Sequence, residues 1–145
     1  MPRDLGIRHP QDSAILITGQ RGKIKYQSIP HSPVGYAVEA GLIEADEAIY
    51  HEERHLLSNM IGSTEMRVEI GPEISLAPRD TLVIASDGLF DNLQIEEIVN
   101  IIRIGPLDQA AENLARTCCT RMTEFSETRP HKPDDLGFIL FRQLR

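Results

Sequence analysis

The clearest pattern in the chain is an apolar run that ends in an acidic turn. Residues 81–85 (Thr-Leu-Val-Ile-Ala) lead through one serine to Asp87 and Gly88. A run of this length, rich in β-branched residues, predicts a buried strand, and the glycine permits a sharp turn after it. The apolar residues between 95 and 102 then recur at the spacing of one helix face. The pattern therefore predicts a strand, a carboxylate, a turn and a helix in succession, with Asp87 held at the end of a rigid strand.

The rest of the chain shows shorter stretches of the same two periodicities. Apolar or alternating residues at 14–17 and 23–27 enclose a glycine-containing turn and predict a hairpin, whereas residues 28–43, with two prolines and two glycines, predict a loop. Asp91 or Asn92 is placed to cap the helix that follows the acidic turn. The remaining expected elements are strands at 67–70, 73–76 and 136–141 and helices at 44–60 and 107–122.

Composition narrows the class of protein. The chain has 145 residues, of which 41% are hydrophobic, so it forms one domain or part of one. Its net charge of −7 argues against nucleic acid as a partner, and no apolar stretch is long enough to span a membrane. The first residues do not form a signal peptide. The two cysteines, Cys118 and Cys119, are adjacent and rarely pair in that arrangement, which fits a reducing cytoplasm, and Cys118 falls on an apolar helix stripe and is expected to be buried.

One short motif suggests different chemistry. Residues 51–55 read His-Glu-Glu-Arg-His, which matches the His-Glu-x-x-His signature of zinc hydrolases, where two histidines one helical turn apart bind Zn²⁺. The charged middle positions fit a buried zinc-protease helix poorly, and the third ligand would have to be Glu69 or Glu73 in an expected strand. A zinc hydrolase that uses His51 and His55 therefore stands as the minor alternative, beside a surface histidine pair with no function.

Three stretches together resemble one family. Residues 85–92 (Ala-Ser-Asp-Gly-Leu-Phe-Asp-Asn) resemble the Ser-Asp-Gly-(apolar)-(aromatic)-Asp motif of metal-dependent protein phosphatases of the PP2C (PPM) family. Residues 41–62 are similar to the family's Gly-Leu-(apolar) segment with its acidic helix start. Residues 134–139 (Asp-Asp-Leu-Gly-Phe-Ile) resemble its closing Asp-Asn-(apolar)-(Ser/Thr)-(apolar)-(apolar) strand, with Asp135 in place of the asparagine and Gly137 in place of the hydroxyl residue.

The resemblance carries expectations for fold and site. It implies an α+β fold in which residues 1–145 form the C-terminal part of a PP2C-like β-sandwich flanked by helices. It also implies that Asp87 and Asp134 are ligands of Mn²⁺ or Mg²⁺ in a two-metal site, with either Asp134 or Asp135 facing the metal. Hard ions of this kind prefer carboxylate and water oxygens, and they offset phosphate charge and activate a water. The implied activity is hydrolysis of phosphoserine and phosphothreonine in a phosphoprotein substrate, with no further catalytic or cofactor-binding residue assigned.

The same resemblance leaves the activity of this chain alone open. The family's N-terminal half carries an arginine thought to hold the phosphate and an Asp-Gly whose aspartate bridges both ions, and neither motif precedes Asp87. We therefore expect a truncated phosphatase domain whose exposed sheet edges favour self-association or pairing with a missing N-terminal half. A non-catalytic PP2C-like binding module is the alternative.

Overall fold

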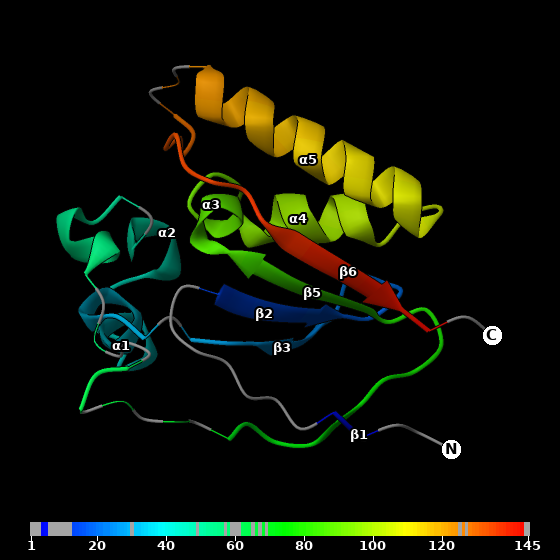
Figure 1. The fold of residues 1–145 in the computed structure, drawn as a ribbon, viewed down its shortest axis with the longest axis horizontal. Coiled ribbons are helices and arrows are strands. Elements are labelled where there is room, and N and C mark those ends of the chain that lie inside the picture. The colour runs from blue at the N-terminus through cyan, green and yellow to red at the C-terminus, as the bar shows by residue number, and fades with distance from the viewer. Residues whose placement is uncertain are drawn as a thin grey trace.

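A computed structural model describes residues 4–5, 13–29, 31–48, 50–56, 58, 62–64, 66, 68, 70–124, 126 and 128–143. Its elements follow one another in an α+β order (Figure 1). The strands are β1 (Asp4–Leu5), β2 (Ser13–Thr18), β3 (Ile24–Gln27), β4 (Ile74–Ser75), β5 (Thr81–Ser86) and β6 (Phe138–Arg142). The helices are α1 (Pro33–Glu39), α2 (Ala45–Ala48), a 3-10 helix (Glu52–His55), α3 (Asp87–Phe90), α4 (Ile95–Ile102) and α5 (Leu107–Thr123).

A four-stranded antiparallel sheet with the order β3-β2-β5-β6 forms the centre of the molecule. Strand β5 pairs with β2 on one side, where Ser13 lies opposite Ser86, and with β6 on the other, where Ala85 lies opposite Phe138. Strands β1 and β4 form a separate two-stranded pair. The predicted acidic turn therefore begins at the end of an inner strand, which has a partner on both sides.

Helices α4 and α5 cover one face of the sheet, as Figure 1 shows. The core between them is built from alternate strand residues and from the apolar stripes that the helical spacing predicted. Its fully buried members include Leu16, Val83, Ile98, Leu114 and Cys118. The prediction of a buried Cys118 is confirmed, and burial, together with the neighbouring Cys119, raises the pKa of its thiol to about 11.

The opposite face of the sheet is covered less completely. Ile15, Ile17 and Leu82 form a small buried cluster there, against which the segment around β4 packs. On the same face of β6, the side chains of Ile139 and Phe141 are 65% and 46% exposed. One face of the sheet is therefore fully covered by a hydrophobic core, whereas the other face is an apolar surface that is partly open to water.

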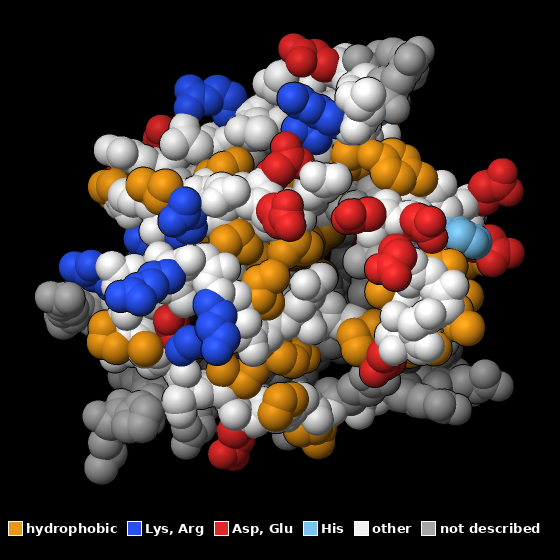
Figure 2. Space-filling model, turned by 180° about the vertical axis from the view of Figure 1, so that it is seen from behind, with side chains coloured by type: hydrophobic (Ala, Val, Ile, Leu, Met, Phe, Trp, Pro, Cys, Tyr) orange, Lys and Arg blue, Asp and Glu red, His pale blue; other side chains and the backbone are white. Residues whose placement is uncertain are grey.

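The two ends of the sheet differ in charge. Figure 2 shows Lys and Arg side chains gathered toward one end of the rear face and Asp and Glu side chains toward the other, where α1 and α2 lie. Helix α2 and the 3-10 helix contribute acidic residues in their first turns. Within the described part of the chain, no helix combines the length and apolarity needed to cross a bilayer.

Several sequence-based expectations are confirmed and others are wrong. The hairpin, the central strand, the helices at 95–102 and 107–122 and the closing strand all form, each within a few residues of the expected bounds. The loop predicted at 28–43 instead contains α1, because Ser32 caps its start and Pro33 fits the first helical position. Within the described residues of the helix predicted at 44–60, only α2 and the 3-10 helix form. Of the strand expected at 67–70, positions 67 and 69 lie outside the described residues.

Candidate metal centre

The candidate site forms where β5 passes directly into α3. Ser86, the last residue of the strand, donates its backbone N–H to the carbonyl of Gly137 at 2.8 Å. Its hydroxyl accepts a hydrogen bond from the Gly137 N–H at 3.1 Å and donates to the Asp135 carbonyl at 3.2 Å. The Ser-Asp-Gly turn and the Asp-Asp stretch, far apart in the sequence, are therefore fastened together at the level of the backbone.

Gly88 permits this close approach for a steric reason. A Cβ atom built on Gly88 would lie 2.3 Å from the backbone oxygen of Asp135, well inside contact distance. The sequence suggested that this glycine serves a sharp turn, but Gly88 lies within α3, and its φ is not among the positive values of the described glycines. The residue is needed because the chain at Asp135 passes directly over it.

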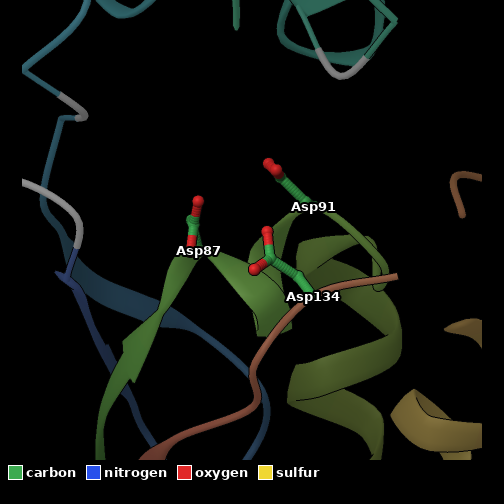
Figure 3. A group of neighbouring side chains, drawn as sticks. All are labelled: Asp87, Asp91 and Asp134. Atoms are coloured by element: carbon green, nitrogen blue, oxygen red, sulfur yellow. The ribbon is translucent and has the colours of Figure 1, made fainter. Parts of the chain in front are cut away.

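Three carboxylates come together above this crossing. Asp87 stands at the first position of α3, Asp91 follows its last residue, and Asp134 comes from the segment that leads into β6; their carboxyl groups point to one common space (Figure 3). One oxygen of each lies within 4.8 Å of the others. Asp87 and Asp134, the two ligands predicted from the sequence, are thus neighbours, and they are joined by Asp91, for which the sequence predicted no role beyond a possible helix cap.

A lysine lies among the three carboxylates. Lys132 Nζ is 2.8 Å from Asp91 Oδ2, 2.9 Å from Asp134 Oδ2 and 3.6 Å from Asp87 Oδ2. Hydrogen bonds from Lys132 and from the backbone N–H of Asp135 lower the pKa of Asp134. Burial acts to lower the pKa of Lys132, but the hydrogen bonds to Asp91 and Asp134 outweigh it and the net pKa is raised. Lys132 and Asp134 each therefore stabilise the charged form of the other.

A buried asparagine fixes the main chain at Lys132. Asn92, which is 0% exposed, accepts a hydrogen bond from the Lys132 N–H at 2.6 Å and donates to its carbonyl at 2.8 Å. The same Asn92 amide also donates to the Gly88 carbonyl at 2.8 Å. The asparagine therefore ties α3 to the segment before β6. It does not cap α4, because the N-cap of that helix is Gln94.

An ion pair between helices supports this arrangement. Arg121 of α5, which is buried, donates to the Asn92 carbonyl at 3.2 Å and forms an ion pair with Glu97 of α4 at 2.7 Å. Burial raises the pKa of Glu97, but hydrogen bonds from Arg121 and from the Gln94 N–H more than offset it, so the net pKa is lowered. The two helices are thus joined to each other and to the base of α3.

The donor set suits a hard divalent cation. The site offers three carboxylate oxygens and is open to water. Mg²⁺ and Mn²⁺ prefer oxygen ligands of these two kinds. No thiol belongs to the group, because Cys118 is buried in the core below and donates to the Gly88 carbonyl at 3.4 Å. Asp134 and Asp135 are both exposed, but only Asp134 belongs to the cluster.

The helix that the zinc motif requires does not form. His51 precedes the 3-10 helix as its N-cap, and its Nδ1 accepts a hydrogen bond from the Glu53 N–H at 3.1 Å. The two histidines therefore do not lie one α-helical turn apart on a helix face, as the zinc signature demands. Glu69 lies outside the described residues, as does the side chain of His55.

Comparison with known proteins identifies the fold. No protein-family model matches the chain. Over 73 residues it is 38% identical to a Streptococcus pyogenes serotype M6 protein named "Putative protein phosphatase 2C-type", a match that covers 50% of this chain and 29% of the relative.

Solved structures agree over nearly the whole chain. The Streptococcus agalactiae serine/threonine phosphatase matches with a TM-score of 0.77 and 24% identity, covering 97% of this chain and 55% of that protein. The catalytic domain of the serine/threonine protein phosphatase PstP, solved with two manganese ions, matches with a TM-score of 0.71 and 20% identity, covering 94% and 52%.

These matches show the fold first. The chain has an α+β fold that corresponds to about half of a serine/threonine phosphatase domain in the solved structures. The resemblance to the PP2C (PPM) family, inferred from the Ser-Asp-Gly and Asp-Asp motifs, is confirmed. The chain spans less than a third of the length of the curated relative that it matches.

Proposed function

We propose that this chain forms part of a PP2C-type protein serine/threonine phosphatase and that Asp87 and Asp134 ligate a Mn²⁺ or Mg²⁺ ion. The observation that supports the proposal most directly is the meeting of three carboxylates at the junction of β5 and α3. Two of them belong to the stretches that resemble the family's metal-binding motifs. Asp91 serves as an additional ligand, directly or through a water.

The proposed chemistry is hydrolysis of phosphomonoesters on serine and threonine of a phosphoprotein. A divalent ion, when bound, offsets phosphate charge and lowers the pKa of a water that attacks phosphorus. Three residues of the chain would hold that ion. Asp87 directly follows the inner strand β5, Asp91 ends the short helix α3, and Asp134 lies on a segment that is hydrogen-bonded to Ser86. The acidic side chains at the same end of the molecule raise the local concentration of cations.

This chain corresponds to only part of a complete phosphatase domain. Because the chain matches about half of each solved phosphatase, the complete activity requires groups that the other half of such a domain supplies. We expect weak or no turnover by this chain alone and metal binding that depends on its own carboxylates.

Metal binding provides the first test. Calorimetric titration with Mn²⁺ should give a binding isotherm for the wild type, and Asp87→Asn and Asp134→Asn should each weaken the affinity at least about tenfold, because each removes one charged ligand. Asp135→Asn and Asp108→Asn, an exposed residue of α5, remove the same charge outside the cluster and should leave the affinity unchanged.

Turnover of a phosphopeptide with Mn²⁺ provides the second test. Any activity of the wild type should be lost in Asp87→Asn, and activity that survives this change would contradict the assigned role. Absence of Mn²⁺ binding by the wild type would favour the non-catalytic binding module instead.

A further inference from the structure

The position of Lys132 has a consequence for the proposed metal centre. Its ammonium group contacts a carboxylate oxygen of Asp91, Asp134 and Asp87 at distances of 2.8, 2.9 and 3.6 Å. These are the three residues whose oxygens could surround a metal ion. The lysine therefore does not lie beside the cluster but contacts every member of it, in the place where a cation belongs.

The fold holds this lysine in place through its backbone. The buried Asn92 binds both the N–H and the carbonyl of Lys132. The backbone at this position is thus fixed independently of the side chain, which is 29% exposed and flexible along its four-carbon stem. An ammonium group on such a stem reaches the cluster or turns toward water without any change in the main chain.

We propose that Lys132 is an internal cation that occupies the metal position and must be displaced when a divalent ion binds. The inference rests on the proposed metal centre and adds to it the residue that sets its affinity. Three carboxylates close together repel one another, and a single ammonium stabilises them in the absence of metal. A divalent ion bound to the same oxygens would lie within a few ångströms of the ammonium, and two positive groups at that distance repel strongly. Metal and Lys132 therefore exclude each other from the cluster.

Removing the charge should strengthen metal binding. In Mn²⁺ titrations of the present chain, Lys132→Met should bind the ion about tenfold more tightly than the wild type, because three partly exposed ion pairs no longer compete. Lys132→Arg retains the charge and should remain close to the wild type. Lys23→Met changes the net charge equally at the exposed turn between β2 and β3, at the other end of the sheet, and should leave the affinity unchanged.

Displacement itself has a separate readout. Reductive methylation followed by mass spectrometry measures how fast the Lys132 amine reacts in the wild-type chain. The rate should be low in the presence of a chelator and rise several-fold with saturating Mg²⁺, because the displaced ammonium turns toward water, whereas Lys23 should react at one rate throughout. Circular dichroism of each variant without metal verifies that it is folded.

The outcomes separate the two proposals. Tighter binding by Lys132→Met together with metal-dependent exposure of Lys132 supports the competition. Equal affinities, weaker binding by Lys132→Met, or an unchanged methylation rate overturns the role of Lys132 while leaving the metal centre intact. A wild type and a Lys132→Met variant that both fail to bind Mn²⁺ overturn the metal centre and, with it, this inference.

Discussion

At the scale of single residues, the site depends on very small separations between backbone segments. Gly88 gives room to the carbonyl of Asp135, and the hydroxyl of Ser86 satisfies backbone groups on both sides of that crossing. Such contacts position Asp87 and Asp134 without involving their carboxylates. Their loss would therefore disturb the centre and the fold together.

Gly88→Ala should destabilise the protein. The new methyl group would meet the Asp135 carbonyl at 2.3 Å, so the segment before β6 must move, and the expected loss in free energy of unfolding is about 1–3 kcal/mol. Urea denaturation followed by circular dichroism measures this loss. Gly137→Ala is the matched control, because a Cβ there meets nothing within 4 Å, and equal stability of the two variants would contradict the steric argument.

At the scale of elements, α4 and α5 act as a joined pair beneath the site. Arg121 connects them through Glu97 and reaches the carbonyl of Asn92, whose side chain holds Lys132. The element that carries the aspartates is itself short, because α3 has only four residues. Its position therefore depends on the longer helices around it.

Arg121→Met should weaken this pair in a pH-dependent way. The net pKa of Glu97 is lowered in the folded protein, so its contribution is present above its ordinary pKa of 4.5 and is lost as the pH falls through the lowered folded value. The variant should lose about 1–2 kcal/mol of unfolding free energy at pH 7, a modest figure because the Glu97 side chain is 33% exposed, and less at pH 3.

The control for this prediction lies on the same helix. Arg116→Met removes an exposed arginine of α5 that is hydrogen-bonded to Asn113 only one turn away, and its stability should stay close to the wild type at both pH values. Urea denaturation at pH 7 and pH 3 compares the three proteins. A deficit of Arg121→Met that grows toward pH 3 would show that the ion pair with Glu97 is not its source.

The signals that the sequence carries are strongest for long periodic elements. Strand β5 and helix α4 were predicted because their apolar residues recur over a whole element, whereas α1 was missed because Ser32 and Pro33 suggest a loop as readily as a helix start. In the range 44–60, where a helix was expected, the side chains that the structure describes are exposed or half-buried, so they offer no apolar face that would stabilise a helix of that length. Elements that depend on tertiary contacts are therefore the ones that pattern alone misjudges.

The residues of the candidate site were also predicted only where a local sequence pattern marks them. Asp87 and Asp134 were found because each belongs to a motif that resembles the phosphatase family, and the structure brings them together. Asp91 and Lys132 were missed as members of the cluster because their role arises from contacts between distant parts of the sequence, such as the one between Asp91 and Lys132, which are 41 residues apart. The acidic turn itself offered a signal for Asp91, since residues four apart share one face of a helical turn.

At the scale of the whole molecule, only one face of the sheet is fully covered by helices. Helices α4 and α5 seal the first face, while Ile139 and Phe141 stand partly exposed on the second. Among the described strands of the four-stranded sheet, β3 and β6 form the two edges, and Lys25 on β3 and Lys23 just before it place charges that discourage pairing at that edge. The face and edge at β6 are thus the place where this chain is most apt to associate.

Self-association should therefore be sensitive to β6. Sedimentation velocity over a range of concentrations should show wild-type oligomers that are lost in the double variant Ile139→Lys/Phe141→Lys, because charges oppose burial of this surface. Leu42→Lys alters an apolar side chain that is 77% exposed near α1 and should leave the association unchanged. A wild type that stays monomeric at all concentrations would contradict the prediction.

The link between Asn92 and Lys132 also bears on how the protein is made. On the ribosome, β3, β2 and β5 can pair as soon as residue 86 has emerged, but Asp87 and Asp91 then still lack Asp134. The cluster comes into being only after residues 87–134 have also left the exit tunnel and the Lys132 backbone has docked on the asparagine. A nascent chain thus completes most of its sheet before the three carboxylates of this cluster can come together.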